Sequence, residues 1–325
     1  MSTRKNERSG LAVKSALVAE ELKKSYGSIL ALDNISFNVF NGEIFGFLGP
    51  NGAGKTTTTN IFTNIIRPTS GVAKIFTFNI VKEPINAKKL IGIVPQEPFV
   101  YNEMSAWDNL MFKAKMHNLG KQERRRKASK LLKEFSLYDR RNDKASTYSG
   151  GMKKLLTMAI ALIHDPKILF LDEPTTGLDV RSSRMIREKI KKLNRAGVTI
   201  FLTTHNMEEA SQLCDRVAII DKGNIISIGT PDKLKKTLQK ELIIELKLKV
   251  APKIQAKIKK GIQGFKKIGK INSIKTGLNI LIKDQSILPD LFQFIRENKI
   301  KISSMNTIKP TLEEAFVRII DQMGK

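Results

Sequence analysis

The sequence predicts an α/β fold in which apolar strands alternate with helices. Three apolar stretches have the length and composition of buried strands, and each is followed by polar or glycine-rich residues: Glu43–Leu48, Ile168–Leu171 and Val198–Leu202. In open parallel sheets, ligands bind outside the carboxyl ends of the strands. We therefore expect a binding site where these three stretches end.

The first of these strands is followed by a complete phosphate-binding loop. It matches G-x-x-x-x-G-K-[ST] and consists of Gly49, Pro50, Asn51, Gly52, Ala53, Gly54, Lys55, Thr56 and Thr57. Its backbone N–H groups are expected to face phosphate oxygens, at the positive N-terminus of a helix predicted from Lys55 to Ile66. Lys55 should reach the β- and γ-phosphates, and Thr56 should ligate Mg²⁺. The loop predicts NTP binding without indicating what hydrolysis drives.

Composition indicates a soluble globular chain with an unusual charge. Its 325 residues are about two domains long, and 41% of them are hydrophobic. Lysine and arginine number 57 against 31 acidic residues, which gives a net charge of +26. One explanation is a polyanionic neighbour such as a membrane face, nucleic acid or the ribosome; the other is a lysine-rich surface without a partner. Both explanations stay open at this point.

Cysteine content and hydropathy indicate the cellular compartment in which the protein is expected. The single cysteine, Cys214, cannot form an internal disulfide, which fits a reducing cytosol and leaves no cysteine-based metal site. The first 24 residues mix both charge signs and lack the apolar core of a signal peptide, so we expect no secretion. The most apolar stretch, Leu155–Leu171, is interrupted at His164–Lys167 and is shorter than the ~20 residues of a membrane span. Any membrane role should need a separate partner.

Further segments precede and follow the loop. Residues 1–17 are expected to be flexible, and short antiparallel strands are expected between Val18 and Val39. Tyr26 lies among them; a lone aromatic residue usually packs, but this one could stack on a nucleotide base. A strand at 91–96 ends in Gln96, and residues 97–160 carry helical, amphipathic spacing. The basic run at 121–127 is interpreted as a solvated helix face rather than a binding patch.

Three more motifs fall at the ends of predicted elements. Ser149-Gly150-Gly151 opens a long apolar helix, where free N–H groups make a weak anion site. The adjacent carboxylates Asp172 and Glu173 end a strand, which suits metal binding by the first and water activation by the second. His205 follows the strand at 198–202. Each motif has a structural explanation by itself, but their combination and order favour a nucleotide site.

With these motifs in this order, the chain resembles the ATP-binding subunit of an ABC transporter from about Val18 to Gly229. The resemblance implies an aromatic loop at Tyr26, Walker A at 49–57, a Q-loop at Gln96, the signature at 149–151, Walker B through Asp172 and a D-loop at 177–179. It implies catalytic roles for Glu173, His205 and Gln96. It also implies that Thr56, Gln96 and Asp172 hold Mg²⁺, and that ATP contacts Tyr26, the Walker A residues, Ser149, Gly150, Gly151 and Asp179.

The signature departs from the usual form of that family. Tyr148 and Met152 stand where Leu and Gln are usual, a form similar to the drug- and antibiotic-resistance type of exporter ATPase, whose permease is a separate polypeptide. Residues 18–232 are therefore expected to form the ATPase domain, with an antiparallel β subdomain and a helical subdomain at about 97–160. Residues 233–325 should form a small α+β accessory domain, possibly ferredoxin-like, because their predicted order is β-α-β-β-α-β. A T-x-x-E capping box at 311–314 and a Thr-Leu-Glu-Glu-Ala-Phe end complete the resemblance.

The resemblance implies an ATP-hydrolysing subunit that drives a separate membrane permease, exporting drugs or other small or lipophilic molecules. A homodimer with two ATP at its interface and a location on the inner face of the cell membrane are expected to follow. The alternative is a soluble ABC ATPase that acts on nucleic acid or the ribosome. A short helical segment replaces the long coiled coil of DNA-repair relatives, and the chain has one motif set where translation-type relatives usually have two. No nucleic-acid partner is therefore expected.

Overall fold

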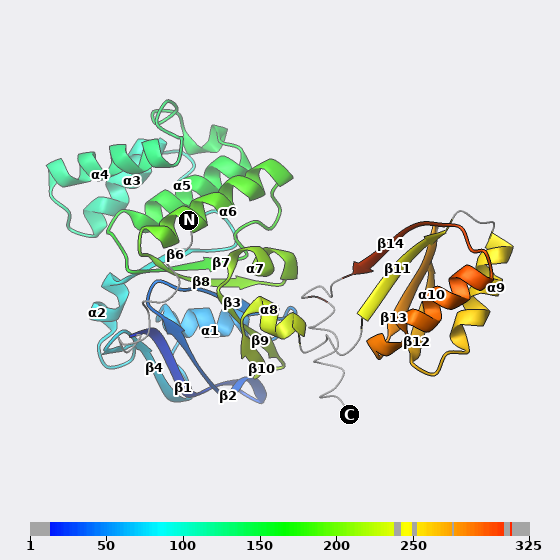
Figure 1. Ribbon diagram of the computed structural model, residues 1–325. Coiled ribbons are helices and arrows are strands. Elements are labelled where there is room, and N and C mark those ends of the chain that lie inside the picture. Colours follow the sequence, from blue (N-terminus) through cyan, green and yellow to red (C-terminus); the bar gives the residue numbers. More distant parts are fainter. Residues whose placement is uncertain (1–13, 237–241, 249–251, 275, 309–312, 314–325) are drawn as a thin grey trace, which may run out of the picture. The chain divides into compact units, whose positions relative to one another are not determined.

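A computed structural model describes residues 14–236, 242–248, 252–274, 276–308 and 313 (Figure 1). The chain divides into two compact units, residues 1–230 and 231–325, and each is considered by itself. The expected flexible segment at 1–17 lies mostly outside the described residues, as does most of the expected capping box at 311–314.

The first unit is built on a six-stranded sheet with the order β10-β9-β3-β8-β7-β6. Its neighbouring strands are parallel from β9 to β6, and β10 is antiparallel to β9. The strands are β3 (Ile44–Leu48), β6 (Ile91–Val94), β7 (Ile168–Asp172), β8 (Thr199–Thr204), β9 (Arg216–Asp221) and β10 (Asn224–Gly229). Because β3, β8, β7 and β6 are consecutive and parallel, the segments that follow them emerge at one edge of the sheet.

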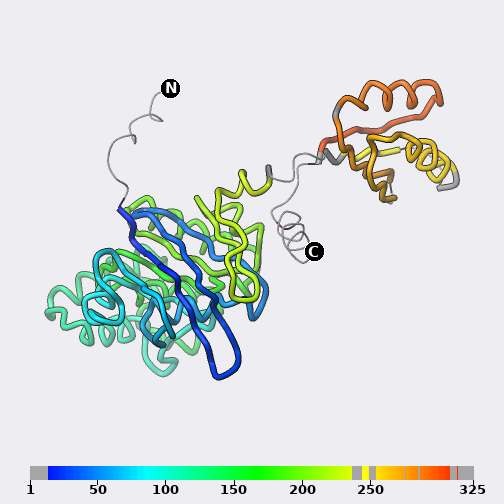
Figure 2. Tube along the Cα trace, turned by 90° about the horizontal axis from the view of Figure 1, so that it is seen from below, coloured from blue at the N-terminus to red at the C-terminus, as the bar shows by residue number. Residues whose placement is uncertain are grey.

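A second, antiparallel sheet has the order β2-β1-β4-β5. It consists of β1 (Ser15–Tyr26), β2 (Ile29–Phe40), β4 (Ser70–Ile75) and β5 (Phe78–Asn79). Figure 2 shows β1 and β2, in blue, side by side as a long hairpin. The antiparallel strands expected between Val18 and Val39 are present, but they are not short, because the polar Asp33 and Asn34 lie at a register shift and not at a strand end. Asn34 has a φ of 49° at this shift, while β2 continues to Phe40.

Helices cover the central sheet, and a mainly helical region separates β6 from β7 (Figure 1). That region contains α3 (Ala106–Met116), α4 (Lys121–Glu134), the short η1 (Ala145–Thr147) and α5 (Gly150–Leu162). The other helices of this unit are α1 (Lys55–Phe62), α2 (Pro84–Lys89), α6 (Val180–Arg195) and α7 (Met207–Leu213). Helix α1 ends four residues before the predicted Ile66, and Asn64 then turns the chain with φ 55°. Among the described residues, no helix has the length and apolarity needed to span a membrane.

An aromatic cluster joins the two sheets and α1. The rings of Phe45, Phe47, Phe62 and Phe201 are fully buried, and Phe37 of the antiparallel sheet lies among them. The Phe37 ring centroid is 5.3 Å from that of Phe47 and 5.8 Å from that of Phe62. Burial of each ring contributes about 1.5–3 kcal/mol. The cluster therefore holds β3 and α1, and with them the loop that joins the two elements.

The second unit begins with α8 (Pro231–Lys236) and continues with an antiparallel sheet of order β12-β13-β11-β14. Its elements are β11 (Leu242–Leu248), α9 (Pro252–Gln263), β12 (Ile268–Ile274), β13 (Gly277–Ile282), η2 (Gln285–Ile287), α10 (Leu288–Glu297) and β14 (Ile302–Ile308). In order of sequence, its four strands are arranged 2-3-1-4, which is the ferredoxin-like arrangement. Side chains such as Leu246, Ile262, Leu278, Ile280 and Leu291 form a separate core.

Candidate active site

The carboxyl ends of the parallel strands enclose a cavity of about 150 Å³. Its walls come from the predicted phosphate loop and from the ends of β6 and β7, although these segments are far apart in the sequence. The lining residues are Ala31, Asn51, Gly52, Gly54, Lys55, Thr56, Thr57, Gln96, Asp172 and Glu173. The structure thus brings the loop, the glutamine and both carboxylates to one place.

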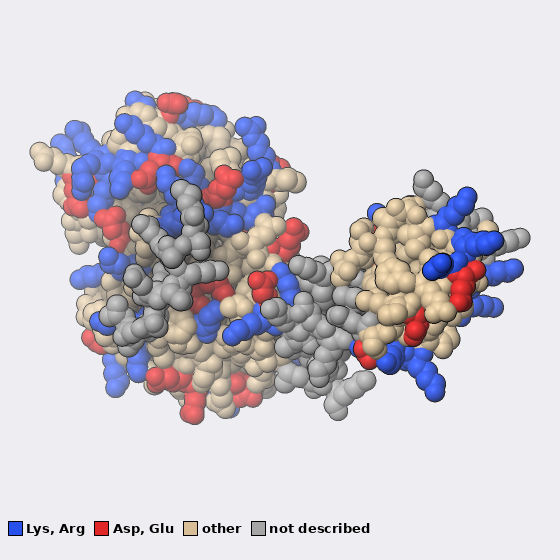
Figure 3. Space-filling model, viewed as in Figure 1, with Lys and Arg blue, Asp and Glu red and all other residues tan. Residues whose placement is uncertain are grey.

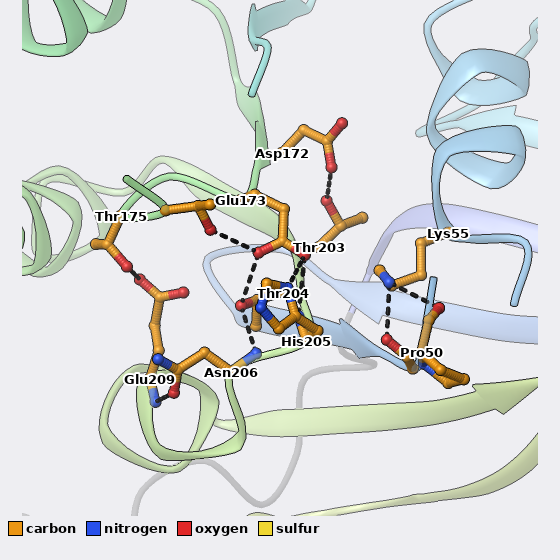
Figure 4. Close-up of polar contacts among 12 residues, drawn as sticks. Pro50, Lys55, Asp172, Glu173, Thr175, Thr203, Thr204, His205, Asn206 and Glu209 are labelled. Atoms are coloured by element: carbon orange, nitrogen blue, oxygen red, sulfur yellow. Dashed lines mark hydrogen bonds and ion pairs between the residues drawn. The ribbon is translucent and has the colours of Figure 1, made fainter. Parts of the chain in front are cut away.

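The loop is shaped by glycine and closed by Lys55. Gly54 has φ 112°, and a Cβ there would lie 2.7 Å from Leu32 Cδ2, so only glycine fits without strain. The Lys55 ammonium donates to Gly49 O at 2.7 Å and to Pro50 O at 3.0 Å (Figure 4). Burial lowers the pKa of Lys55, and the charges of Glu173 and Asp172 oppose this effect. Lys55 is a cation at the closed end of a loop rich in N–H groups, an arrangement suited to phosphate.

Asp172 ends β7, and its carboxylate accepts a hydrogen bond from the Thr203 hydroxyl of β8 (Figure 4). This contact leaves the carboxylate at the cavity wall together with Thr56 and Gln96. Among the described residues there is no cluster of three His, Cys, Asp or Glu side chains that could hold a metal. The side chains that could ligate a metal here are few and offer oxygen atoms. Such a set suits Mg²⁺, which keeps several water ligands and is also bound by the phosphates of its substrate.

Glu173 is buried and is held by four donors. Its Oε1 accepts from the His205 backbone N–H at 3.0 Å and from His205 Nδ1 at 2.8 Å. Its Oε2 accepts from the hydroxyls of Thr176 at 3.0 Å and Thr204 at 3.3 Å. Since a carboxylate only accepts, Nδ1 of His205 carries the proton in this contact. Figure 4 shows Glu173 and His205 as neighbours from β7 and β8, a pairing suited to a general base and the group that orients it.

Other predicted site residues lie outside this cavity. Ser149 is the N-cap of α5, where its hydroxyl accepts from the Met152 N–H at 3.3 Å, and Gly150 is exposed. Gly151 lies against the start of α6, because a Cβ there would be 2.7 Å from Ser182 Oγ. Asp179 is the N-cap of α6 and accepts from both the N–H and the hydroxyl of Ser182, which lower its pKa. These four residues form a separate surface on the same unit.

Tyr26 also lies apart from the lining of the cavity. It ends β1 at the tip of the long hairpin, where 46% of its surface is exposed. The Lys24 ammonium lies 4.9 Å from the centre of its ring. Base stacking by Tyr26 therefore stays a prediction.

Several residues in and around the site were not singled out from the sequence. Thr176, Thr203 and Thr204 hold the two carboxylates, and the buried Glu209 accepts from Thr175 at 2.7 Å. Burial raises the pKa of Glu209. Lys154 donates to the backbone of the Gln96 segment. The available signal was a lysine directly before the apolar run at 155–163, within the predicted helix, since a buried lysine needs acceptors.

The fold and the site together define a P-loop NTPase built on a mainly parallel sheet. Comparison with known proteins gives the family. Residues 32–176 match the family model described as ABC transporter, and residues 229–320 match the C-terminal domain of DrrA1-3-like ATP-binding proteins. The chain belongs to the ABC transporter ATP-binding proteins, in the branch that includes drug- and antibiotic-resistance ATPases.

Named relatives and solved structures agree with this assignment. The linearmycin resistance ATP-binding protein LnrL of Bacillus subtilis is 37% identical over 93% of this chain and 97% of its own length. The doxorubicin resistance ATP-binding protein DrrA of Mycobacterium tuberculosis is 40% identical over 68% of this chain and 67% of its own. Among structures, cbiO1 of Clostridium perfringens, part of the complex cbiONQ, matches with TM-score 0.65 and 30% identity over 70% of this chain and 94% of its own.

A further solved structure is that of a similar cassette, which is dimeric. The ATP-binding cassette MJ0796, bound to ADP and Pi in a post-hydrolysis state, matches with TM-score 0.60 and 28% identity over 66% of this chain and 98% of its own. The predicted family, fold class and ATPase activity are confirmed by these comparisons.

Proposed function

We propose that this chain pairs head to tail with a second copy, binds two ATP at the interface and drives a separate permease that exports drugs or other small, lipophilic molecules. The observation that carries the proposal is the division of the motifs. Lys55, Gln96, Asp172 and Glu173 line one cavity, whereas Ser149 and its neighbours lie on a separate surface. A second copy would bring its own Ser149 surface to this cavity and complete the site.

In this proposal the residues that line the cavity have separate roles in ATP hydrolysis. Lys55 exchanges its loop carbonyls for phosphate oxygens, and the loop N–H groups hold the remaining oxygens. Thr56, Gln96 and Asp172 would hold Mg²⁺, which neutralises charge on the phosphates. Glu173 accepts the proton of the attacking water, while His205 and the two threonines hold its carboxylate in place.

The separate permease is supported by an exposed apolar groove of about 520 Å³ in the first unit. Ile65 and Phe99 line it and are 66% and 67% exposed, which is typical of surfaces that another protein covers. The groove also contains Pro95, the neighbour of Gln96, so a partner there would lie close to the catalytic segment. We therefore propose a location at the inner face of the membrane, held there by the permease.

Drug export is supported by the names of the relatives, since LnrL and DrrA are described as resistance proteins for linearmycin and doxorubicin. None of the relatives reported above supports the alternative of an ATPase that acts on nucleic acid or the ribosome.

The test is Glu173→Gln, which keeps the shape of the side chain and removes the base. ATP affinity should survive while hydrolysis falls by ~10²–10⁴-fold, the usual range for loss of a general base. With hydrolysis blocked, the variant should accumulate as a dimer in ATP and remain monomeric in ADP, as measured by size-exclusion chromatography with light scattering.

The matched control is the double variant that carries Ser149→Arg in addition to Glu173→Gln. The arginine places a bulky side chain in the proposed shared site and leaves the phosphate loop intact. It should abolish the dimer and keep ATP binding. Since Ser149 caps α5, a loss of about 1 kcal/mol in stability is also expected and is checked by thermal melting. Wild-type hydrolysis by Glu173→Gln would refute the catalytic role, and an ATP-bound variant that stays monomeric would refute dimerisation of the isolated chain.

A further inference from the structure

Lys154 carries a buried charge in the middle of an apolar helix. It lies in the second turn of α5 and is 2% exposed, and its neighbours Leu155, Leu156 and Met158 are buried as well. Removing an ammonium from water is costly unless it is hydrogen-bonded and close to opposite charge. The surroundings of this side chain must therefore supply acceptors.

Those acceptors are two consecutive backbone carbonyls of the segment that carries Gln96. Lys154 Nζ donates to Pro95 O and to Gln96 O, both at 2.8 Å. An ammonium has three donors, so two of them hold this segment. Burial lowers the pKa of Lys154 to about 8, and the carboxylates of Asp172, Glu97, Glu209 and Glu173 favour its charged form. When Lys154 carries its proton, both contacts are charge-assisted and are stronger than neutral hydrogen bonds.

The hydrogen bonds of Lys154 connect two segments that take part in different nucleotide contacts. The side chain of Gln96 lines the ATP cavity of its own chain. Ser149 begins the helix that carries Lys154, and five residues of helix separate them by only about 7.5 Å. A displacement of α5 would therefore move the Gln96 segment through the Lys154 side chain.

We propose that Lys154 is a positioning residue, which ties the signature helix α5 to the Gln96 segment and so keeps Gln96 placed for ATP turnover. Transmission from the partner's nucleotide through Ser149 rests on the proposed dimer. The placement of the Gln96 segment within one chain does not. A misplacement of about 1 Å at a catalytic group can reduce turnover by 10²-fold, so a link of this kind affects kcat more than affinity.

The experiment compares Lys154→Met, which keeps the length without the charge, and Lys154→Arg, which keeps the charge. Lys130→Met is the control, because it removes a lysine that is 70% exposed on α4. For Lys154→Met we expect ATP affinity within about twofold of wild type, since the phosphate loop is intact, and kcat lower by roughly 10- to 100-fold. Lys154→Arg should recover part of the loss, and the control should match wild type in both quantities.

Recovery in Lys154→Arg separates positioning from simple packing, because both variants fill the space of the lysine side chain and only Arg can donate to the two carbonyls. Wild-type kcat in Lys154→Met would overturn the assignment.

Hydrogen exchange tests the link without a dimer or a permease. In ATP-free Lys154→Met, exchange should increase in peptides that cover residues 93–100 and stay unchanged in the phosphate loop. Unchanged exchange at 93–100, or an equal increase throughout the first unit, would overturn the proposal, and the latter would show a structural role only. Because this readout uses the single chain, it distinguishes failure of the link from failure of the Glu173→Gln dimer test.

Discussion

Glu173 has a backbone conformation that side-chain-bearing residues seldom adopt. Its φ is 45°, in the left-handed region, and such a conformation costs of order 1–3 kcal/mol unless its surroundings hold it. Here the Glu173 N–H donates to Thr203 O at 2.9 Å, and four donors hold the carboxylate. The end of β8 therefore determines the direction of a side chain that follows β7.

At the scale of single residues, a prediction concerns the Lys55 side chain. Lys55→Ala removes the side-chain cation of the loop, and a hydrogen bond to a charged group is worth about 1.5–3 kcal/mol. We expect ATP affinity to fall by roughly 10- to 100-fold and turnover to vanish, as measured by calorimetry and phosphate release. Lys74→Ala, which removes a half-buried lysine of β4 that pairs with Glu20 at 3.3 Å, serves as the control. Wild-type hydrolysis by Lys55→Ala would refute the role of the loop.

At the scale of elements, two histidines join α3 to the turn after α5. His117 is the C-cap of α3, and its ring stacks on that of His164 with centroids 3.9 Å apart. His164 Nε2 donates to Ile91 O of β6 at 2.8 Å. Burial, the adjacent His164 and Lys113 lower the pKa of His117 to about 4, and burial also lowers that of His164. Lys127 of α4 lowers the pKa of His164 further, and Asp165 raises it.

These depressed pKa values predict acid sensitivity. Above the unfolded-state pKa of about 6.5, His117 is neutral in both states and the packing contributes fully. As pH falls from about 6.5 toward 4, the unfolded chain binds a proton that the folded chain does not, and stability is lost. His117→Phe keeps an aromatic ring that cannot titrate, so its melting temperature should fall less over this window. The comparison is made by thermal melting from pH 8 to 4, and parallel curves for the two proteins would contradict it.

At the scale of the whole molecule, the charge of +26 is spread over the surface. Figure 3 shows many basic side chains over the helical region, where α4 alone exposes Lys121, Arg125, Arg126, Lys130 and Lys133. Some basic residues there are paired, such as Lys127 with Glu123 at 3.1 Å and Asp165 at 2.6 Å. The carboxylates of these pairs are 42% and 76% exposed, and ion pairs that solvent reaches contribute little to stability, so the helices are held mainly by the core beneath them.

This surface predicts how the isolated chain meets membranes. Without its permease, the protein should bind vesicles that contain phosphatidylglycerol at low salt and should be released at 1 M salt, where the Debye length shrinks to ~3 Å. Vesicles of phosphatidylcholine alone should bind little at either salt concentration. Sedimentation with vesicles measures both. Retention after a 1 M wash would show an apolar attachment and would contradict a purely electrostatic contact.

The local motifs were accessible from the amino-acid sequence alone, because each depends on a short run of residues. The loop at 49–57 requires glycines and a lysine at set spacings, and the paired carboxylates follow directly from an apolar strand. The alternation of apolar runs with helical patterns predicts the α/β class, and the comparisons confirm the family that the order of motifs indicated. Short-range rules failed for the hairpin of β1 and β2, where bulges continue strands across polar positions.

Only the tertiary structure decided which distant residues meet. The sheet order that places β8 between β3 and β7 brings Thr203 to Asp172 and His205 to Glu173. Packing of α5 against β6 brings the Lys154 ammonium to carbonyls 58 and 59 residues away. No local preference encodes these contacts, because strand order and helix packing result from burying apolar faces over the whole unit at once. The sequence therefore determined the chemical groups of the site, and the fold determined how they are oriented and linked.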